Sequence, residues 1–197
     1  MTDLDRRSFV ALLAAAGASV AVRDVPVSGQ TDESYRLLVV GDSLIWGQGL
    51  EEKDKIYTHV AEWLRRDVLR SRRRVDVTVK AHSGATIRFD AKDAEKLRSR
   101  GKDEDYFYRG EVNISTPSMW KQVEVAAEEY RASGETRGAD MVLLTAGVTD
   151  IGVEGVLDPF GSNKKLVQLV EEVCRGRVGA LLEHISTNNP DALIAVA

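Results

Sequence analysis

Two short, almost uninterrupted apolar runs constrain the fold of this chain most strongly. One covers residues 37–40 (LLVV) and the other residues 141–146 (MVLLTA), and a glycine follows each run. A strand that is apolar at every position is typical of a sheet covered on both faces, as in parallel sheets flanked by helices. The chain is therefore predicted to contain a mainly parallel sheet with a helical layer on each side.

The segments around these runs fit the same architecture. Residues 75–81 alternate apolar and polar side chains, which predicts a strand with an edge-like pattern. Apolar positions at helical spacing predict helices over 53–68, 119–130 and 166–185, and a last apolar run predicts a fourth buried strand over 192–197. Strands that alternate with helices predict a three-layer α/β/α domain with a flavodoxin-like, mainly parallel sheet.

Two local features refine this prediction. Thr116 is expected to cap the helix over 119–130, with Pro117 in its first turn, where the missing N–H is tolerated. Residues 88–111 are dense in charge and carry little apolar periodicity. This segment is therefore predicted to run over the surface, and long surface segments of this kind often border a binding site.

The first residues have the composition of a targeting segment. Arg6 and Arg7 precede an apolar stretch over 9–22, which is shorter than the about 20 residues that a membrane-spanning helix needs. Residues 1–30 therefore resemble a twin-arginine-like signal and linker, which implies passage through the twin-arginine translocation machinery and an exported location, extracellular, periplasmic or in the cell envelope. The alternative is an N-terminal amphipathic helix of the domain itself. The folded domain is expected over 31–197.

Composition excludes several classes of function. The 27 basic and 31 acidic residues leave a net charge of −4, which gives no general attraction to nucleic acid. The single cysteine, Cys174, is expected to be a small buried hydrophobe, and the three histidines are scattered without a metal-ligand spacing. No metal and no cofactor are expected.

Polar turns with a glycine follow three of the predicted strands. They are Gly41-Asp42-Ser43-Leu44, His82-Ser83-Gly84 and Gly147-Val148-Thr149-Asp150. In a parallel sheet all three turns lie at the carboxyl edge, where open α/β sheets bind their ligands. The hydroxyl of Ser43 is then exposed as a nucleophile, and Gly84 can bring a backbone N–H close to a developing oxyanion. The first turn, with Asp42 and Asp150, can also be read as ordinary cap and turn residues.

In order and placement these turns resemble blocks I, II and III of the SGNH, or GDSL-type, serine hydrolases. The resemblance extends over residues 36–197 and implies Ser43 as the catalytic nucleophile of an ester hydrolase. It implies that the N–H groups of Ser43 and Gly84 donate to the oxyanion, and that Asp42 and Asp150 support the site. The expected substrate is a small-molecule or carbohydrate ester, either acyl or O-acetyl, with no cofactor.

The chain departs from the family pattern in two places. The family has Gly-x-Asn-Asp in block III, and here Thr149 stands in place of the asparagine that is the third oxyanion donor. Thr149 can donate only one hydroxyl proton, so a weaker enzyme is expected. The last block, Asp-x-x-His, does not occur in the sequence, so the domain is expected to lack the last strand and helix. The general base is then expected from other sequence or another chain, with His82 as the local alternative.

Two other functions remain open. A noncatalytic exported ligand-binding domain, or an inactive fragment of such a hydrolase, would fit Thr149 and the missing histidine. A doubly wound nucleotide-binding module would fit the sheet, but the first strand is followed by neither Gly-x-Gly-x-x-Gly nor a Walker sequence.

Overall fold

The structure is a computed structural model that describes residues 34–89, 91–102, 110–111, 113–134, 137–152 and 161–197. The predicted signal segment, residues 1–30, lies outside the described residues. In the described part of the chain, no helix is long and apolar enough to cross a membrane.

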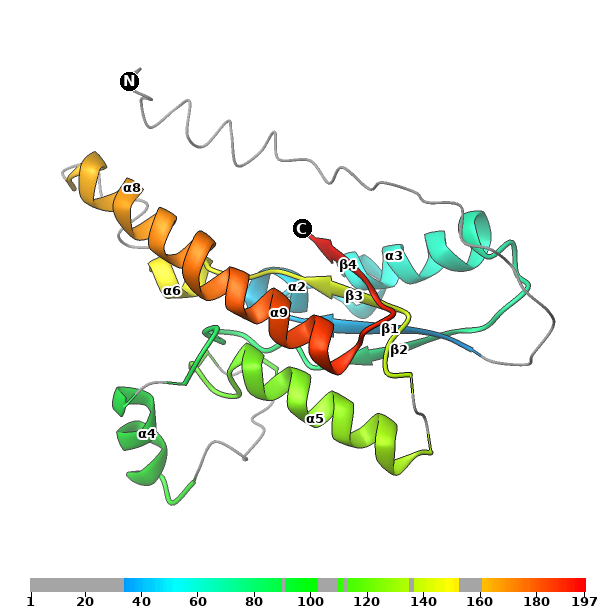
Figure 1. Cartoon of the computed structure of the whole chain (residues 1–197), viewed down its shortest axis with the longest axis horizontal. Helices are drawn as coiled ribbons and strands as arrows, with labels where there is room; N and C mark the ends of the chain where they lie inside the picture. The colour runs from blue at the N-terminus through cyan, green and yellow to red at the C-terminus, as the bar shows by residue number, and fades with distance from the viewer. Residues whose placement is uncertain (1–33, 90, 103–109, 112, 135–136, 153–160) are drawn as a thin grey trace.

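A four-stranded parallel sheet forms the centre of the fold (Figure 1). Its strands are β1 (Tyr35–Val40), β2 (Val75–Val79), β3 (Met141–Leu144) and β4 (Leu193–Val196), in the order β2-β1-β3-β4. Strand β1 pairs with β2 on one side and with β3 on the other. The predicted parallel sheet is confirmed, as is the position of β2 at its edge.

Successive residues of β1 point to opposite faces of the sheet, and each face has its own core. Leu37 and Val39 pack with Ile45 and Tyr57 from the segment that follows β1. This layer contains α2 (Ser43–Trp46), η1 (Glu52–Asp54), α3 (Ile56–Trp63) and η2 (Leu64–Val68). Helices therefore cover this face, as the apolar spacing over 53–68 predicts.

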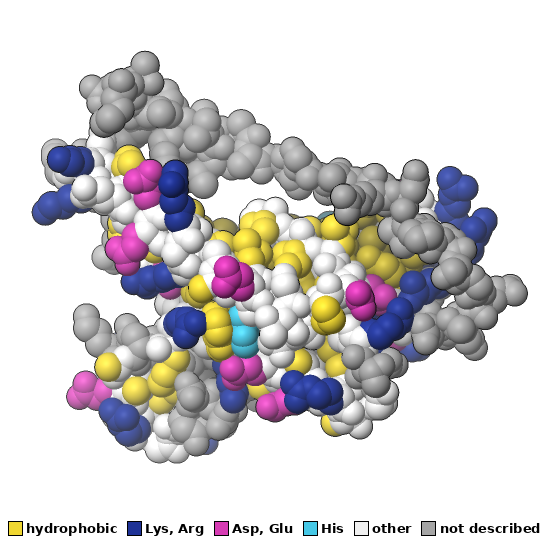
Figure 2. All heavy atoms as spheres, viewed as in Figure 1, with side chains coloured by type: hydrophobic (Ala, Val, Ile, Leu, Met, Phe, Trp, Pro, Cys, Tyr) yellow, Lys and Arg dark blue, Asp and Glu magenta, His cyan; other side chains and the backbone are white. Residues whose placement is uncertain are grey.

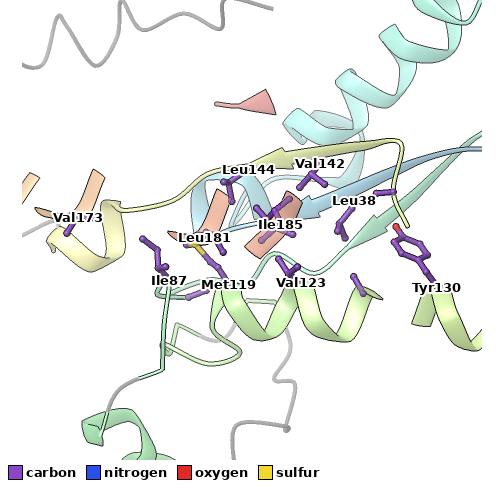
Figure 3. Close-up of a cluster of buried hydrophobic side chains, with 14 residues drawn as sticks. Leu38, Ile87, Met119, Val123, Tyr130, Val142, Leu144, Val173, Leu181 and Ile185 are labelled. Atoms are coloured by element: carbon purple, nitrogen blue, oxygen red, sulfur yellow. The ribbon is translucent and has the colours of Figure 1, made fainter. Parts of the chain in front are cut away.

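The other face carries the larger core (Figure 3). Leu38 of β1 and Leu144 of β3 pack against side chains from α5 (Met119–Ala132), η3 (Glu172–Val178) and α9 (Gly179–Asn188). Together with α8 (Asn163–Glu171), η3 and α9 form the long helical stretch in Figure 1. The two helical layers confirm the three-layer α/β/α architecture.

The start of α5 differs from the prediction. Ser118 is the N-cap, and its side chain accepts a hydrogen bond from the N–H of Lys121. Thr116 and Pro117 lie before the cap, so the predicted cap was placed two residues too early. Serine is as good a cap as threonine, and the sequence Thr116-Pro117-Ser118 offers both.

Three further predictions need correction. Strand β4 is not a buried strand, because it pairs only with β3, and Leu193 and Val196 stay about half exposed. Cys174 is exposed rather than buried. The described residues of the segment 88–111 lie mostly at the surface as predicted, but they include α4 (Ala91–Arg98), whose Leu97 is buried.

The strand order sets where a ligand can bind. From β1 the chain moves to β2 through α3, and it then returns past β1 to β3 through α5 on the opposite face. The connection after β3 contains η3 and α9, which pack on the same face as α5. The connections after β1 and β3 therefore leave the sheet toward opposite faces. In open α/β sheets, such a switch point between neighbouring strands opens a crevice at their carboxyl ends.

Because the aliphatic side chains of β1 are fully buried, truncating one of them should destabilise the fold strongly. We expect Leu38→Ala to lower the free energy of unfolding by about 2–5 kcal/mol, because it removes a fully buried side chain and leaves a cavity. Leu193→Ala on β4 is the matched control, with a loss of about 1 kcal/mol or less. Urea unfolding of both variants measures the difference, and equal losses would contradict the proposed core.

Candidate functional site

The backbone of Gly41 joins three parts of the fold directly after β1. Its N–H donates to Gln122 Oε1 on α5 at 2.9 Å. Its carbonyl accepts from Gln122 Nε2 at 3.1 Å and from the N–H of His82, after β2, at 3.0 Å. A Cβ on Gly41 would lie 2.6 Å from the carbonyl oxygen and hydroxyl of Thr145, and φ is +146°. Only glycine fits this close approach of the β1 and β3 connections.

Gln122 is a residue that the sequence analysis did not find. It is fully buried, and its second amide bond goes to the carbonyl of Pro117 at 3.3 Å. The available signal was its place on the apolar face of the helix, between Met119 and Val123. A polar side chain on a buried face must find hydrogen-bond partners, and here it finds the backbone of the residue two positions before Ser43.

Asp42 connects the β1 and β3 connections through its carboxylate. The residue is 1% exposed and is the N-cap of α2, with Oδ1 accepting from the N–H of Leu44 at 3.0 Å. The same oxygen accepts from the Thr145 hydroxyl at 2.9 Å, and Oδ2 accepts from the Thr149 hydroxyl at 3.3 Å. Asp42 is thus both a cap and a bridge between the two connections, and its supporting role at an active site remains a prediction.

Ser43 is the first residue of α2 and is half-buried. Among the described residues, its hydroxyl forms no hydrogen bond, and its backbone N–H donates none. Helix α2 ends after one turn at Gly47, which has a left-handed conformation with φ of +67°. The serine therefore sits at the carboxyl end of the central strand with its polar groups uncommitted within the described part of the chain.

Gly84 lies in the connection after β2, next to a segment that precedes α5. Its φ is +80°, and a Cβ there would lie 2.5 Å from Asn113 Oδ1 and 2.8 Å from the backbone nitrogen of Ile114. Glycine is therefore required for both conformation and space. Its N–H has no hydrogen-bond acceptor among the described residues, as an oxyanion donor needs, but its role remains a prediction.

Thr149 and Asp150 belong to α6 (Val148–Ile151), the short helix after β3. The Thr149 hydroxyl proton points to Asp42, so this arrangement does not offer it to a ligand. The Asp150 side chain is 2% exposed, accepts from the N–H of Ile87 at 3.0 Å and lies 3.5 Å from Arg177. Burial raises the pKa of the Asp150 carboxyl, while the Ile87 N–H and Arg177 oppose that rise. Asp150 thus ties the β2 and β3 connections together.

A hollow of about 630 Å³ opens beside these connections. Gly84 and Thr149 line it, together with residues from 86–89, 113–115, α4 and η3, and Ser43 lies outside its lining. In Figure 2 the surface is hollowed between the end that carries α8 and the end that carries α4. Arg88, Phe89 and Lys96 from the segment 88–111 line the hollow, and the place of this segment beside a binding site remains a prediction.

A stack of three side chains forms beside the hollow, and the sequence analysis did not find it. The Arg88 guanidinium lies over the Trp120 ring at 3.6 Å, and the His184 ring stacks on Trp120 at 3.8 Å. Burial lowers the pKa of His184, against an opposing effect of Glu124.

The other two histidines lie apart from this stack. His59 is exposed on α3, and His82 is buried beside Ser83. In the described part of the chain, no cluster of histidine, cysteine and carboxylate side chains could hold a metal ion.

Replacing Gln122 tests how firmly the turn before Ser43 is held. We expect Gln122→Met, which keeps most of the volume, to lower the free energy of unfolding by about 1–3 kcal/mol, because it leaves the buried N–H of Gly41 without a partner and removes one of the two donors to its carbonyl. Gln168→Met on α8 is the control, since Gln168 is exposed. Chemical denaturation compares the two variants, and equal stability would contradict the clamp.

His184 gives a pH dependence with a defined sign. Its folded pKa is lowered by burial, so the fold favours the neutral ring. Its contribution to stability is fully present above the unfolded pKa of about 6.5 and is lost as the pH falls toward the folded value. When the pH is lowered from about 7.5 to about 5, we expect the urea midpoint of unfolding to decrease in the unchanged chain. The decrease should be smaller in His184→Gln. An identical pH profile would contradict this assignment.

Comparisons with known proteins find resemblance only at the level of structure. No family model matches the chain, and none of the curated proteins compared with it matches. The crystal structure of AlinE4, an SGNH-hydrolase family esterase, aligns with 14% identity and a TM-score of 0.38, over 84% of this chain and 77% of that chain. Two mutants of AlinE4 align over the same shares with 18% and 16% identity and TM-scores of 0.35 and 0.33. Values this low establish neither family nor activity.

Proposed function

We propose that this chain belongs to a serine ester hydrolase of the SGNH type, with Ser43 as its nucleophile. The observation that supports the proposal is the meeting of three connections around the carboxyl end of β1. Ser43 follows β1 itself, Gly84 follows β2 and Thr149 follows β3, and β1 lies between the other two strands. Hydrogen bonds of Gly41 and Asp42 join all three connections.

In this proposal Ser43 Oγ attacks the carbonyl carbon of an acyl or O-acetyl ester. The alcohol leaves, an acyl-enzyme forms on Ser43, and water then releases the acid. The N–H groups of Ser43 and Gly84 donate to the oxyanion of each tetrahedral intermediate. The base that takes the Ser43 proton is supplied by residues outside this sequence, as the family resemblance implies. Export through the twin-arginine pathway is part of the same proposal and rests on residues 1–30 alone.

A fluorophosphonate probe tests this proposal. We expect the 197-residue chain, together with the sequence that supplies the base, to be labelled at Ser43, because the probe needs an activated serine. Peptide mass mapping locates the label, and Ser43→Ala should abolish it. Ser162→Ala is a suitable control, because Ser162 is an exposed N-cap of α8 and lies outside the lining of the hollow. An unlabelled but folded protein would contradict the proposal.

One observation favours the second candidate, a noncatalytic ligand-binding domain. The Thr149 hydroxyl donates to Asp42 instead of facing a ligand, so the third oxyanion donor is absent in this arrangement. Loss of one such donor costs about 10²–10³ in turnover.

The variants Thr149→Asn and Thr149→Val separate the two candidates. For a hydrolase, Thr149→Asn should raise the turnover of a simple aryl acetate, because a side-chain amide can donate to the oxyanion. Thr149→Val should leave turnover within about tenfold, because the hydroxyl proton already belongs to Asp42. Steady-state kinetics of the chain together with the sequence that supplies the base measure both effects, and no turnover in any variant would favour the binding domain.

A further inference from the structure

The hollow beside Gly84 and Thr149 has a charge opposite to that of the whole chain. Its lining contains the basic residues Arg88, Lys96 and Arg177 and one acidic residue, Asp150, a net charge of +2. The complete sequence carries −4. The Asp150 side chain is 2% exposed and turns its carboxylate toward Ile87 and Arg177, so little of its charge faces solvent.

The fold holds Arg88 and Arg177 at the same hollow. Asp150 accepts from the N–H of Ile87, the residue before Arg88, and its other oxygen lies 3.5 Å from Arg177 Nη1. Arg88 is fixed further by its backbone carbonyl, which accepts from the Thr86 hydroxyl at 3.0 Å, and by its guanidinium over the Trp120 ring. Two guanidinium groups from different parts of the chain are therefore positioned before any ligand arrives.

The remaining lining identifies the kind of ligand. Asn113 and Ser115 contribute amide and hydroxyl groups, the hydroxyl protons of Thr86 and Thr149 go to Arg88 and Asp42, and Phe89 and Ile114 are the large apolar side chains. A site for a long acyl chain would be lined mainly by apolar groups. Guanidinium groups bind carboxylate, sulfate and phosphate oxygens through charge-assisted hydrogen bonds. The chemistry of this lining fits a small, polar, negatively charged group.

We infer that the hollow binds an anionic group of the ester substrate, with Arg88 and Arg177 as its main contacts. Binding of the anion needs only this lining. Its assignment to a substrate rests on the proposed function, because Gly84 and Thr149 belong to both the hollow and the three connections around Ser43. The charge can lie on the acid part or on the alcohol part of the ester, and the two arrangements give different products.

The first experiment measures binding without catalysis. Glutarate represents a charged acid product and 4-hydroxybenzenesulfonate a charged alcohol product, each titrated into the full chain by calorimetry at constant ionic strength. We expect one of them to bind, and Arg88→Gln to weaken its affinity about tenfold or more, because a charge-assisted contact is lost. Arg175→Gln is the control for loss of a positive charge. Arg175 is exposed on η3, the element that also carries Arg177, and it lies outside the lining of the hollow. Circular dichroism checks that both variants fold.

The result has clear consequences. Binding that depends on Arg88 and not on Arg175 supports the anion site, and the probe that binds shows which part of the ester carries the charge. No binding of either probe, or equal losses in the two variants, would overturn it.

A kinetic experiment separates this inference from the proposed function. Phenyl acetate is compared with 4-sulfophenyl acetate, and phenyl butyrate with the monophenyl ester of glutaric acid, with Ser43→Ala as the background. We expect the charged member of one pair to have a kcat/KM at least about tenfold higher, and Arg88→Gln to remove that preference. Turnover without a preference would overturn the inference and leave the hydrolase standing. Anion binding with no turnover of any ester would overturn the hydrolase and leave the anion site standing.

Discussion

The burial of β1 on both faces is the constraint on which the rest of this structure depends. A strand with neighbours on both sides and helices above and below has no exposed polar backbone, so its register and direction are fixed. Because β2 and β3 run parallel to it, their carboxyl ends meet the carboxyl end of β1 at one edge. The order β2-β1-β3-β4 then sends the connections after β1 and β3 to opposite faces, and the space between them becomes available.

The hydrogen bonds at this edge are denser than cap and turn chemistry requires. Gln122 binds both the N–H and the carbonyl of Gly41, and the carbonyl also accepts from a backbone N–H after β2. The Asp42 carboxylate accepts hydrogen bonds from two threonine hydroxyls that follow β3. Ser43 follows directly on this rigid pair. A residue that must keep a fixed orientation is better placed beside such a network than on a mobile loop. The same network has a chemical consequence, because it occupies the only proton that the Thr149 side chain can donate.

The sequence predicted the layers and the buried strands at the centre well, for a physical reason. Strands such as residues 37–40 and 141–144 are buried on both faces and need apolar side chains at every position. This pattern can be recognised in one sequence without any structure. Predictions failed where tertiary context decides. Strand β4 has the same composition as a buried strand, but its place at the edge leaves Leu193 and Val196 half exposed. Likewise nothing local shows that Cys174 turns outward.

The sequence predicts which loops form the candidate site. It does not predict which side chains contact one another there. Glycine and small polar residues after strands marked Ser43, Gly84 and Thr149. The partners of these residues come from distant parts of the chain, such as Gln122 on α5 and Trp120 beneath Arg88, and no local pattern connects them. The direction of the Thr149 hydroxyl depends on Asp42, which is 107 residues away in the sequence. Contacts at that separation follow from the fold and are not visible in periodicity.

The opposite signs of the hollow and of the whole chain affect how an anion would reach it. From a distance, a molecule with a net charge of −4 repels anions, whereas close to the hollow the guanidinium groups attract them. Dissolved salt screens charges beyond a Debye length of about 8–10 Å and acts less on a contact inside a partly enclosed site. Moderate salt should therefore weaken the distant repulsion more than the local attraction. Such a surface selects its ligand at short range and offers it no electrostatic guidance on approach.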